Sequence, residues 1–301
     1  MRVMLFISVC FIWGTTWLAM AIAGESIPSL AATALRFMVM SPILIVIALK
    51  SQVPLLFPRK KWHYIPVIAI FYFAIPFWFM IEGEKYISSG LASIIFSYMP
   101  ITIMLLSYLM ARQRFTLRQI MALLVTLASL AGIIAIESGI SGSNYLVGIA
   151  LLSGAVLLHG CIYILKQHRF EQIHALTFSA IPSGVASILL LFASLAMEKT
   201  LVSEISLLSL LAVLYLGSVA GVGGIVAYFK LNALVTPFKA SLCFLVFPMI
   251  AVGLEAMVTG RMLSSFSLLF TLPLACGIYL LLKPEQASRD EGEIATQRRV
   301  G

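Results

Sequence analysis

Ten apolar stretches, separated by short polar connectors, constrain this chain more than any other feature of its sequence. A helix that crosses the hydrocarbon core of a bilayer needs about 20 mostly apolar residues. The stretches that meet this requirement are residues 3–23, 30–49, 64–82, 88–110, 118–136, 145–166, 175–197, 206–229, 239–259 and 264–282. Only 11% of the residues are charged, against roughly a quarter in a soluble domain, so the chain cannot cover a water-soluble surface. The sequence therefore predicts an all-α membrane protein with ten transmembrane helices.

The composition and the motifs exclude several other classes of function. Lysine and arginine exceed the acidic residues by 20 to 12, but no soluble domain carries the basic stripe that a nucleic acid would need. No Gly-x-x-x-x-Gly-Lys-[Ser/Thr] phosphate loop, His-Glu-x-x-His zinc motif or Gly-x-Ser-x-Gly nucleophile motif occurs. The four cysteines lie in separate apolar stretches, where we expect small buried residues, not metal ligands or disulfides. We therefore expect no enzyme, catalytic residue, cofactor, metal site or nucleic-acid partner.

The connectors divide into a basic set and a nearly neutral set. Sixteen of the 20 lysine and arginine residues lie in the two termini and in every second connector, whereas the other connectors hold Lys85, Lys199 and Arg261. Loops rich in lysine and arginine stay in the cytoplasm, so this split predicts that both termini are cytoplasmic. Residues 2–23 also resemble a cleaved secretory signal, but its removal would leave nine spans and break the repeat described next.

The two halves of the sequence share a short pattern. Residues 82–106, moved by 148 positions, fall on residues 230–254 with five identities. The identical pairs are Ala92 and Ala240, Ser93 and Ser241, Phe96 and Phe244, Pro100 and Pro248, and Leu106 and Leu254. Five spans per half is an odd number, so the halves enter the membrane from opposite sides, as in inverted-repeat transporters that hold substrate near the midplane. We predict a first five-helix repeat at 3–137, a second at 145–282 and a disordered cytoplasmic tail at 283–301.

Four motifs, taken in order, resemble one transporter family. They are F-I-W-G-T-T-W-L-A-M-A from Phe11 to Ala21, with Pro28 after it; A-L-R-F from Ala34 to Phe37; E-K-Y-I-S-S-G-L-A-S from Glu84 to Ser93, with Pro100; and R-Q-R-F-T-L-R-Q from Arg112 to Gln119. Over residues 3–282 the chain is similar to the drug/metabolite transporter superfamily, EamA type. The resemblance implies ten helices in two inverted five-helix copies. It also implies export of small metabolites, such as amino acids and related compounds or drugs, across the bacterial inner membrane.

The chain departs from the family pattern at two places. Gln113 and Arg261 stand where family members commonly carry a glutamate thirteen residues beyond the proline of the fourth helix of each copy. The second copy of the Trp-Gly-Thr motif reads His159-Gly160-Cys161. These departures put any role of the missing acids in doubt for this chain.

The predicted function is secondary transport by alternating access, with export of amino acids or related compounds as the first candidate. Multidrug efflux is an alternative within the same class. A non-transporting membrane sensor or assembly subunit is an alternative from another class. Beyond the lipid bilayer and a small-molecule substrate, protons or another coupling ion are candidate partners, while facilitated exchange and the oligomeric state, monomer or dimer, stay open.

Ionisable residues inside apolar stretches are the first candidates for the substrate site, because a charge in the bilayer is costly. Arg36 is a candidate to contact an anionic group of the substrate, or to serve a structural role. Glu255, expected near the middle of its helix, is a candidate cation or proton site, or else a buried hydrogen-bond acceptor. His159 is a substrate or proton-carrying candidate, or a core histidine. Glu82 and Glu84 flank the turn between two stretches, where we expect snorkelling or capping.

Aromatic residues and helix breakers complete the candidate site. Flat side chains offer walls for an organic solute, although ordinary packing explains them as well. The aromatic candidates are Trp13, Trp17, Trp78 and Tyr98, with Phe96 close to Tyr98. The candidate hinges are Pro100, Pro248, Gly221 and Gly224. Proline allows a helix to bend and glycine allows close contact or sliding between helices, so we expect paired bent helices along the transport path.

Overall fold

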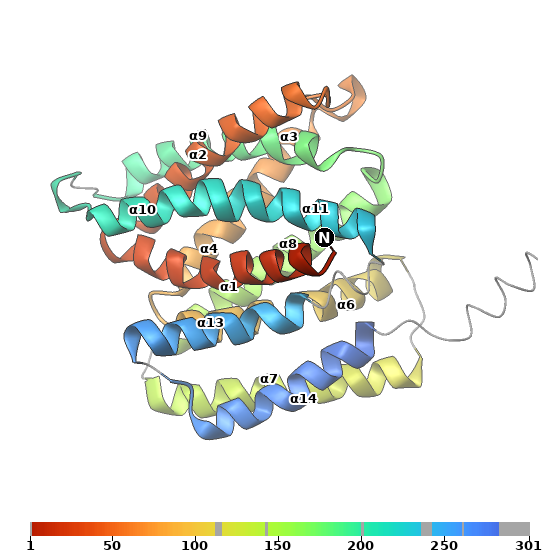
Figure 1. Cartoon of the computed structure of the whole chain (residues 1–301), viewed down its shortest axis with the longest axis vertical. Coiled ribbons are helices and arrows are strands. Elements are labelled where there is room, and N and C mark those ends of the chain that lie inside the picture. Colours follow the sequence, from red (N-terminus) through yellow and green to blue (C-terminus); the bar gives the residue numbers. More distant parts are fainter. Residues whose placement is uncertain are drawn as a thin grey trace, which may run out of the picture.

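The computed structural model describes the chain except for residues 1, 112–115, 142–143, 200–201, 236–242, 261 and 283–301. Several sequence-based predictions lie outside the described residues: the disordered tail, the departures at Gln113 and Arg261, and the start of the ninth predicted span. Within the described part every regular element is a helix, which confirms the all-α class (Figure 1).

The helices follow the ten predicted stretches closely. The α-helices are α1 Arg2–Ser26, α2 Ser29–Lys50, α3 Tyr64–Ile68, α4 Ile75–Gly83, α5 Ser89–Phe96, α6 Met99–Ala111, α7 Leu117–Ser141, α8 Tyr145–Arg169, α9 Ala175–Met197, α10 Leu207–Tyr215, α11 Gly224–Leu234, α13 Cys243–Thr259 and α14 Ser265–Leu282. Short 3₁₀ turns, η1 and η3, cover Arg59–Lys61 and Val202–Glu204. Two π-helical segments, η2 Ala69–Ala74 and η4 Leu216–Gly223, join α3 to α4 and α10 to α11.

Seven helical stretches of the described chain are long and apolar enough to cross a membrane. They are Arg2–Ser26, Ser29–Lys50, Tyr64–Gly83, Ser89–Leu106, Tyr145–Lys166, Ala175–Met197 and Leu207–Tyr228. Shorter apolar helical stretches occupy Leu117–Ile133, Val246–Thr259 and Ser265–Leu280. The chain therefore has the helices of a multi-pass membrane protein, whereas the count of ten spans stays a prediction.

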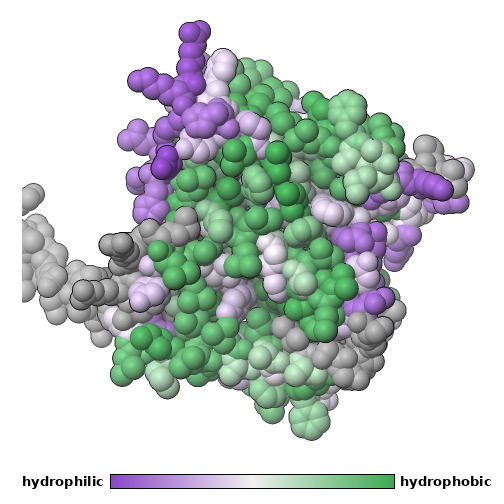
Figure 2. Space-filling view, turned by 180° about the vertical axis from the view of Figure 1, so that it is seen from behind, coloured by the Kyte–Doolittle hydropathy of each residue, from purple (hydrophilic) through white to green (hydrophobic). Residues whose placement is uncertain are grey.

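The surface has the distribution that a bilayer requires. Figure 2 shows hydrophobic residues over most of the visible face, with hydrophilic residues gathered toward its left and right sides. Large apolar side chains point outward along many helices; Leu195 is 74% exposed and Phe266 is 70% exposed. A soluble monomer rarely exposes so much contiguous apolar surface, so this surface fits contact with lipid.

Small residues allow α2 and α9 to pack along each other. A Cβ atom on Gly184 would lie 2.6 Å from Ser41 Oγ, so only glycine fits at this crossing. Two hydroxyl groups bond across the same interface: Ser41 Oγ donates to the Ala180 carbonyl at 2.8 Å, and Ser187 Oγ donates to the Ala34 carbonyl at 2.8 Å. Small side chains with interhelical hydrogen bonds are typical of helix packing in membranes.

The two π-helical segments lie at matching places in the two halves. The offset of 148 residues that relates the halves carries η2 onto residues 217–222, inside η4. In the first half, Pro76 follows η2 and lacks the N–H that would bond to the carbonyl of Tyr72, so the regular α pattern is interrupted there. In the second half the segment L-G-S-V-A-G-V-G is rich in small residues. The matched π segments support an internal repeat, while the inverted arrangement itself stays a prediction.

The remaining helices enclose the interior between the halves. α1 packs against α13, α4 against α8, and α5 against α13. α7 and α14 lie side by side at one edge of the molecule, seen at the bottom of Figure 1. Side chains from α1, α2, α4, α5, α8 and α13 therefore meet inside the bundle.

Candidate functional site

Arg36 is a buried cation whose hydrogen-bonding capacity is only partly used. It is 4% exposed, so it does not snorkel to the surface. Its guanidinium carbon lies 4.5 Å from the centre of the Phe77 ring, and Nη1 donates to Met20 Sδ at 3.6 Å. Nε is buried without a hydrogen-bond partner among the described residues. Because a guanidinium carries five N–H donors, Arg36 has donors available for an anionic group.

His159 lies among three aromatic rings close to Arg36. The ring centre of His159 is 5.0 Å from Tyr72, 5.2 Å from Phe77 and 5.6 Å from Phe96. Its Nδ1 is 2.9 Å from the Ala155 carbonyl oxygen. A carbonyl can only accept, so Nδ1 carries the proton of this bond, and in the neutral ring Nε2 is the atom that accepts. Arg36 and His159 share Phe77 as a neighbour, which brings two predicted site residues together.

Trp17 and Trp13 extend the aromatic wall along α1. Trp17 is 3% exposed, with its ring 5.3 Å from Phe96 and stacked at 6.5 Å on Phe247. Trp13 lies 6.2 Å from the same Phe247 ring and 5.5 Å from Phe244. Since both tryptophans contact Phe247, they face the same side of α1. The wall therefore joins α1, α5, α8 and α13.

Trp78 and Tyr98 occupy different surroundings. Trp78 is half-buried, lies 5.3 Å from the neighbouring Phe79 ring and packs against the core between α2 and α9. Tyr98 is half-buried in the short break between α5 and α6. Among the described ring contacts, none joins Trp78 to His159. The predicted role of Trp78 in binding, like that of Tyr98, stays a proposal.

Glu255 is not in the middle of its helix, which corrects the sequence-based expectation. It lies four residues before Thr259, the last residue of α13, and its Oε2 accepts a hydrogen bond from the Gly90 N–H at 2.7 Å. Gly90 is the second residue of α5. An anion is favoured at a helix N-terminus, because the first N–H groups lack partners within the helix and the helix dipole is positive there. A Cβ on Gly90 would lie 2.7 Å from Oε2, so this approach requires glycine.

Glu84, for which the sequence predicted snorkelling or capping and no substrate role, lies inside the protein. It follows α4 in the turn, yet both of its carboxylate oxygens are buried without a hydrogen-bond partner among the described residues. Burial raises the pKa of Glu84 well above its usual range, the charge of Glu255 raises it further, and the charge of Arg36 acts in the opposite direction. Glu84, Glu255 and Arg36 therefore share one region of the interior. Its position in the E-x-Y-x-S-S-G motif was the one signal for it in the sequence.

Glu82 makes side-chain contacts in its turn, whereas snorkelling or capping was expected. It forms a salt bridge with Lys85 at 2.7 Å and accepts a hydrogen bond from Ser29 Oγ. Glu198 bonds to the start of α2 nearby, where it accepts from the Leu30 N–H at 2.8 Å and the Ala31 N–H at 3.0 Å. These contacts tie the beginning of α2 to the ends of α4 and α9.

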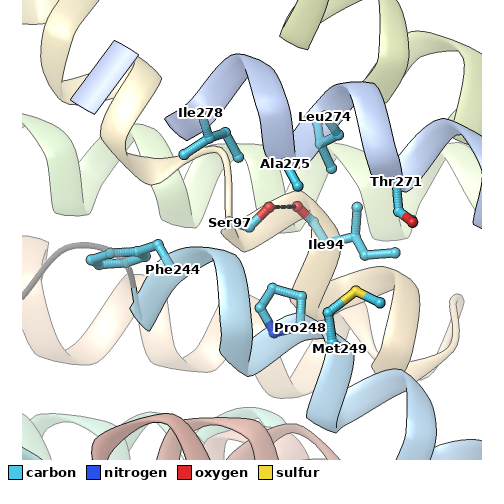
Figure 3. A pocket seen from close by; sticks show the side chains of 9 residues that line it. All are labelled: Ile94, Ser97, Phe244, Pro248, Met249, Thr271, Leu274, Ala275 and Ile278. Atoms are coloured by element: carbon cyan, nitrogen blue, oxygen red, sulfur yellow. Dashed lines mark hydrogen bonds between the residues drawn. The ribbon is translucent and has the colours of Figure 1, made fainter. Parts of the chain in front are cut away.

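The two candidate hinge prolines have different settings. The helix is interrupted at Ser97 and Tyr98, and Pro100 is the second residue of α6 after this break. Pro248 lies inside α13, where it cannot donate to the carbonyl of Phe244. Figure 3 shows a small pocket between these segments and α14. Its lining residues are Ile94, Ser97, Phe244, Pro248, Met249, Thr271, Leu274, Ala275 and Ile278.

The two candidate hinge glycines are places of close helix contact. A Cβ on Gly221 would lie 2.9 Å from Met40 Sδ, and a Cβ on Gly224 would lie 3.0 Å from Trp13 Nε1. Gly221 thus lies against α2 and Gly224 against α1. Both positions suit close packing as well as sliding, so their hinge role stays a prediction.

Comparisons with known proteins identify one family over both halves. Residues 1–135 and 146–283 match the EamA-like transporter family. Protein PagO of Salmonella typhimurium is 44% identical over 278 residues, which cover 92% of this chain and 91% of PagO. An uncharacterized transporter of Buchnera aphidicola (subspecies Schizaphis graminum) is 37% identical over 94% of each chain. One solved crystal structure has the same fold, with a TM-score of 0.66, 16% identity, and coverage of 93% of this chain and 97% of that chain.

Proposed function

Because this chain belongs to the EamA-like transporter family, we propose that it exports small organic metabolites across the bacterial inner membrane by alternating access. The family consists of transporters, not enzymes, and the Buchnera aphidicola relative is named as a transporter as well. The proposal includes ten spans in two inverted repeats, cytoplasmic termini and a substrate site between the repeats. The sixteen-to-three distribution of basic residues over the connectors supports this orientation.

The buried guanidinium of Arg36 is the observation from which we propose the class of substrate. Its buried guanidinium has free donor capacity and lies beside Phe77, with His159, Phe96 and Trp17 continuing the aromatic wall. A guanidinium recognises a carboxylate through paired hydrogen bonds. The buried carboxyl of Glu84 lies in the same region and offers an oxygen that can accept a hydrogen bond from an amine, because neither of its oxygens has a donor among the described residues. We therefore propose an amphoteric solute with an apolar part, such as an amino acid or a related compound.

Drug efflux is the second candidate function. The carboxyl groups of Glu84 and Glu255 lie in the same region as Arg36, and acidic groups beside aromatic walls also suit an organic cation. The two candidates differ in the role of Arg36, which contacts an anionic group only in the first.

A resistance screen tests both candidates. Cells that express the protein are grown with inhibitory amino acids, their analogues and cationic drugs, and compared with cells that carry an empty vector. New resistance to amphoteric compounds supports the first candidate, and resistance restricted to organic cations supports the second. If neither resistance nor sensitisation occurs with any compound, while vesicles made from the purified protein also transport none of them, the transport proposal is wrong and a sensor or assembly role takes its place.

Arg36→Met gives the sharper test once a transported compound is known. We expect it to lower the apparent affinity for a carboxylate-bearing substrate at least tenfold, because the paired hydrogen bonds are lost. Lys50→Met, which removes an exposed charge at the end of the same helix, is the matched control and should leave affinity unchanged. Equal affinity of Arg36→Met and wild type would remove Arg36 from the substrate site.

A further inference from the structure

Two buried carboxylates lie close to the start of α5, and their surroundings differ. Glu255 Oε2 accepts the Gly90 N–H at 2.7 Å, at a helix N-terminus that favours an anion. Glu84 has two buried oxygens and no hydrogen-bond partner among the described residues. A buried carboxylate without a donor is unstable as an anion and takes up a proton instead. The arrangement therefore suits one proton on Glu84 and a negative charge on Glu255.

The other charged groups around the pair are already accounted for. The charge of Arg36 on α2 acts on Glu84 and on His159 of α8, so these groups lie in one region. Glu82 and Lys85, in the turn before α5, pair with each other at 2.7 Å. Glu25, at the end of α1, is exposed. Among the described residues Arg36 is thus the cation that balances a single negative charge on the pair, and a second negative charge would have no counterpart.

The bond between Glu255 and Gly90 also joins the two halves of the chain. Glu255 belongs to α13 in the second half, and Gly90 belongs to α5 in the first. Val252, one turn before Glu255, packs on Gly90 as well, with its Cα 3.2 Å from the position of a Cβ there. If Glu255 becomes protonated, its hydrogen bond loses the charge assistance that roughly doubles its strength, and the attraction to the helix dipole disappears. Protonation would therefore weaken the contact that holds α13 against the start of α5.

We infer that Glu84 and Glu255 form a proton-binding site that holds one proton in this structure, and that a second proton, taken up by Glu255, releases α13 from the start of α5. The inference rests on the proposed transport function, since alternating access needs such a contact between the halves to open and close. It assigns the proton as the ion that controls this contact. The second proton comes from a hydronium ion of the aqueous phase, which becomes water, and it neutralises Glu255.

Infrared spectroscopy of the purified full-length protein tests the first proton. At neutral pH we expect the carbonyl band of a protonated, buried carboxylic acid in wild type. This band should disappear in Glu84→Gln and stay in Glu25→Gln, the control at an exposed acid. If Glu84→Gln does not give folded protein, Glu84→Asp should retain the band at a shifted frequency. A wild-type protein without the band, or with a band that Glu84→Gln leaves unchanged, would overturn the assignment.

Thiol labelling tests the release of α13. In a variant with Cys10, Cys161, Cys243 and Cys276 replaced by alanine, Val252→Cys places a single thiol at the contact with Gly90. Met257→Cys, on the exposed side of the same helix, corrects for the pH dependence of the reagent. We expect the ratio of labelling rates, Val252→Cys over Met257→Cys, to rise at least fivefold as the pH falls and Glu255 takes up its proton.

Glu255→Gln supplies the deciding comparison. It mimics the neutral state, so labelling at Val252→Cys should be fast at every pH, whereas Glu25→Gln should keep the wild-type profile. A pH-independent ratio in wild type, or slow labelling in Glu255→Gln, would overturn the release step. Neither experiment needs a substrate, so a failed resistance screen and a failed proton assignment are recognised separately.

Discussion

At the scale of single residues, Gly90 explains why one position of the Glu84–Ser93 motif cannot carry a side chain. Its missing Cβ leaves room for Glu255 Oε2 and for the backbone of Val252. In the sequence it is a glycine near the start of a helix, where glycine is a weak helix former, and the cap position belongs to Ser88. The reason for the glycine is a contact with a residue 165 positions away.

Gly90→Ala should therefore destabilise the protein. The added methyl would meet Glu255 Oε2 at 2.7 Å and Val252 Cα at 3.2 Å, so α13 must shift, and we expect a loss of about 1–3 kcal/mol. Gly253→Ala on α13 is the matched control, because nothing lies within 4 Å of its added methyl. That control should be neutral or more stable by about 0.4–1 kcal/mol. Thermal unfolding of both variants in the same detergent makes the comparison, and equal melting temperatures would contradict the proposed crowding.

Glu198 offers a second test at a helix N-terminus. Its carboxylate accepts the Leu30 and Ala31 N–H groups and the Ser194 hydroxyl at 2.8 Å, so Glu198→Ala leaves the first turn of α2 without these bonds. We expect a loss of about 1 kcal/mol, as for other helix caps. Glu204→Ala, at an exposed acid in the following turn, should be silent. Hydrogen exchange at Leu30 and Ala31 should accelerate in Glu198→Ala alone, and unchanged exchange there would argue against the capping role.

At the scale of elements, the helix ranges were predictable and the interruptions inside them were not. Length and hydropathy determine an apolar helix, so the ten predicted stretches agree with the described helices within a few residues at most ends. The π segments and the break at Ser97 and Tyr98 depend on single prolines, on small residues and on tertiary packing, which a hydropathy pattern does not record. Pro76 lacks the N–H that would continue the α pattern after η2, but Pro42, Pro182 and Pro273 lie inside α-helices without such an interruption, so a proline alone does not predict a π segment.

Pro248→Ala tests whether an interruption serves movement. The alanine supplies an N–H for the Phe244 carbonyl, so α13 should become more regular and the melting temperature should rise. If α13 bends at this point during transport, the transport rate should fall at least threefold while expression persists. Pro273→Ala is the matched control, since Pro273 lies inside α14, whose main neighbour is α7. It should raise the melting temperature without slowing transport, and equal rates in both variants would remove Pro248 from the moving parts.

At the scale of the whole molecule, the candidate site was only partly predictable. Arg36, His159 and Trp17 were identified because ionisable and aromatic residues in apolar stretches stand out by type, and the fold brings them together around Phe77 and Phe96. Glu84 was placed in a solvated turn because the sequence cannot show that its carboxylate folds inward. Glu255 was placed too deep for a related reason: the end of its helix and its partner Gly90 depend on how the halves pack.

The orientation of the whole molecule is the last prediction, and the distribution of charge argues for it. Arg59, Lys60 and Lys61 form the turn η1 in the connector after α2, in which Arg59 and Lys60 are exposed. The connector between α9 and α10 carries Lys199 beside the acids Glu198 and Glu204. Basic loops are retained in the cytoplasm, so these two connectors should lie on opposite sides of the membrane.

A reporter that is active only in the cytoplasm should work when fused after Arg299 and fail when inserted after Ser203. The same insertion within η1, after Lys60, serves as the cytoplasmic control. Activity at Ser203 together with inactivity at Arg299 would reverse the orientation. Activity at both sites would refute the ten-span arrangement, because an odd number of spans separates them in it.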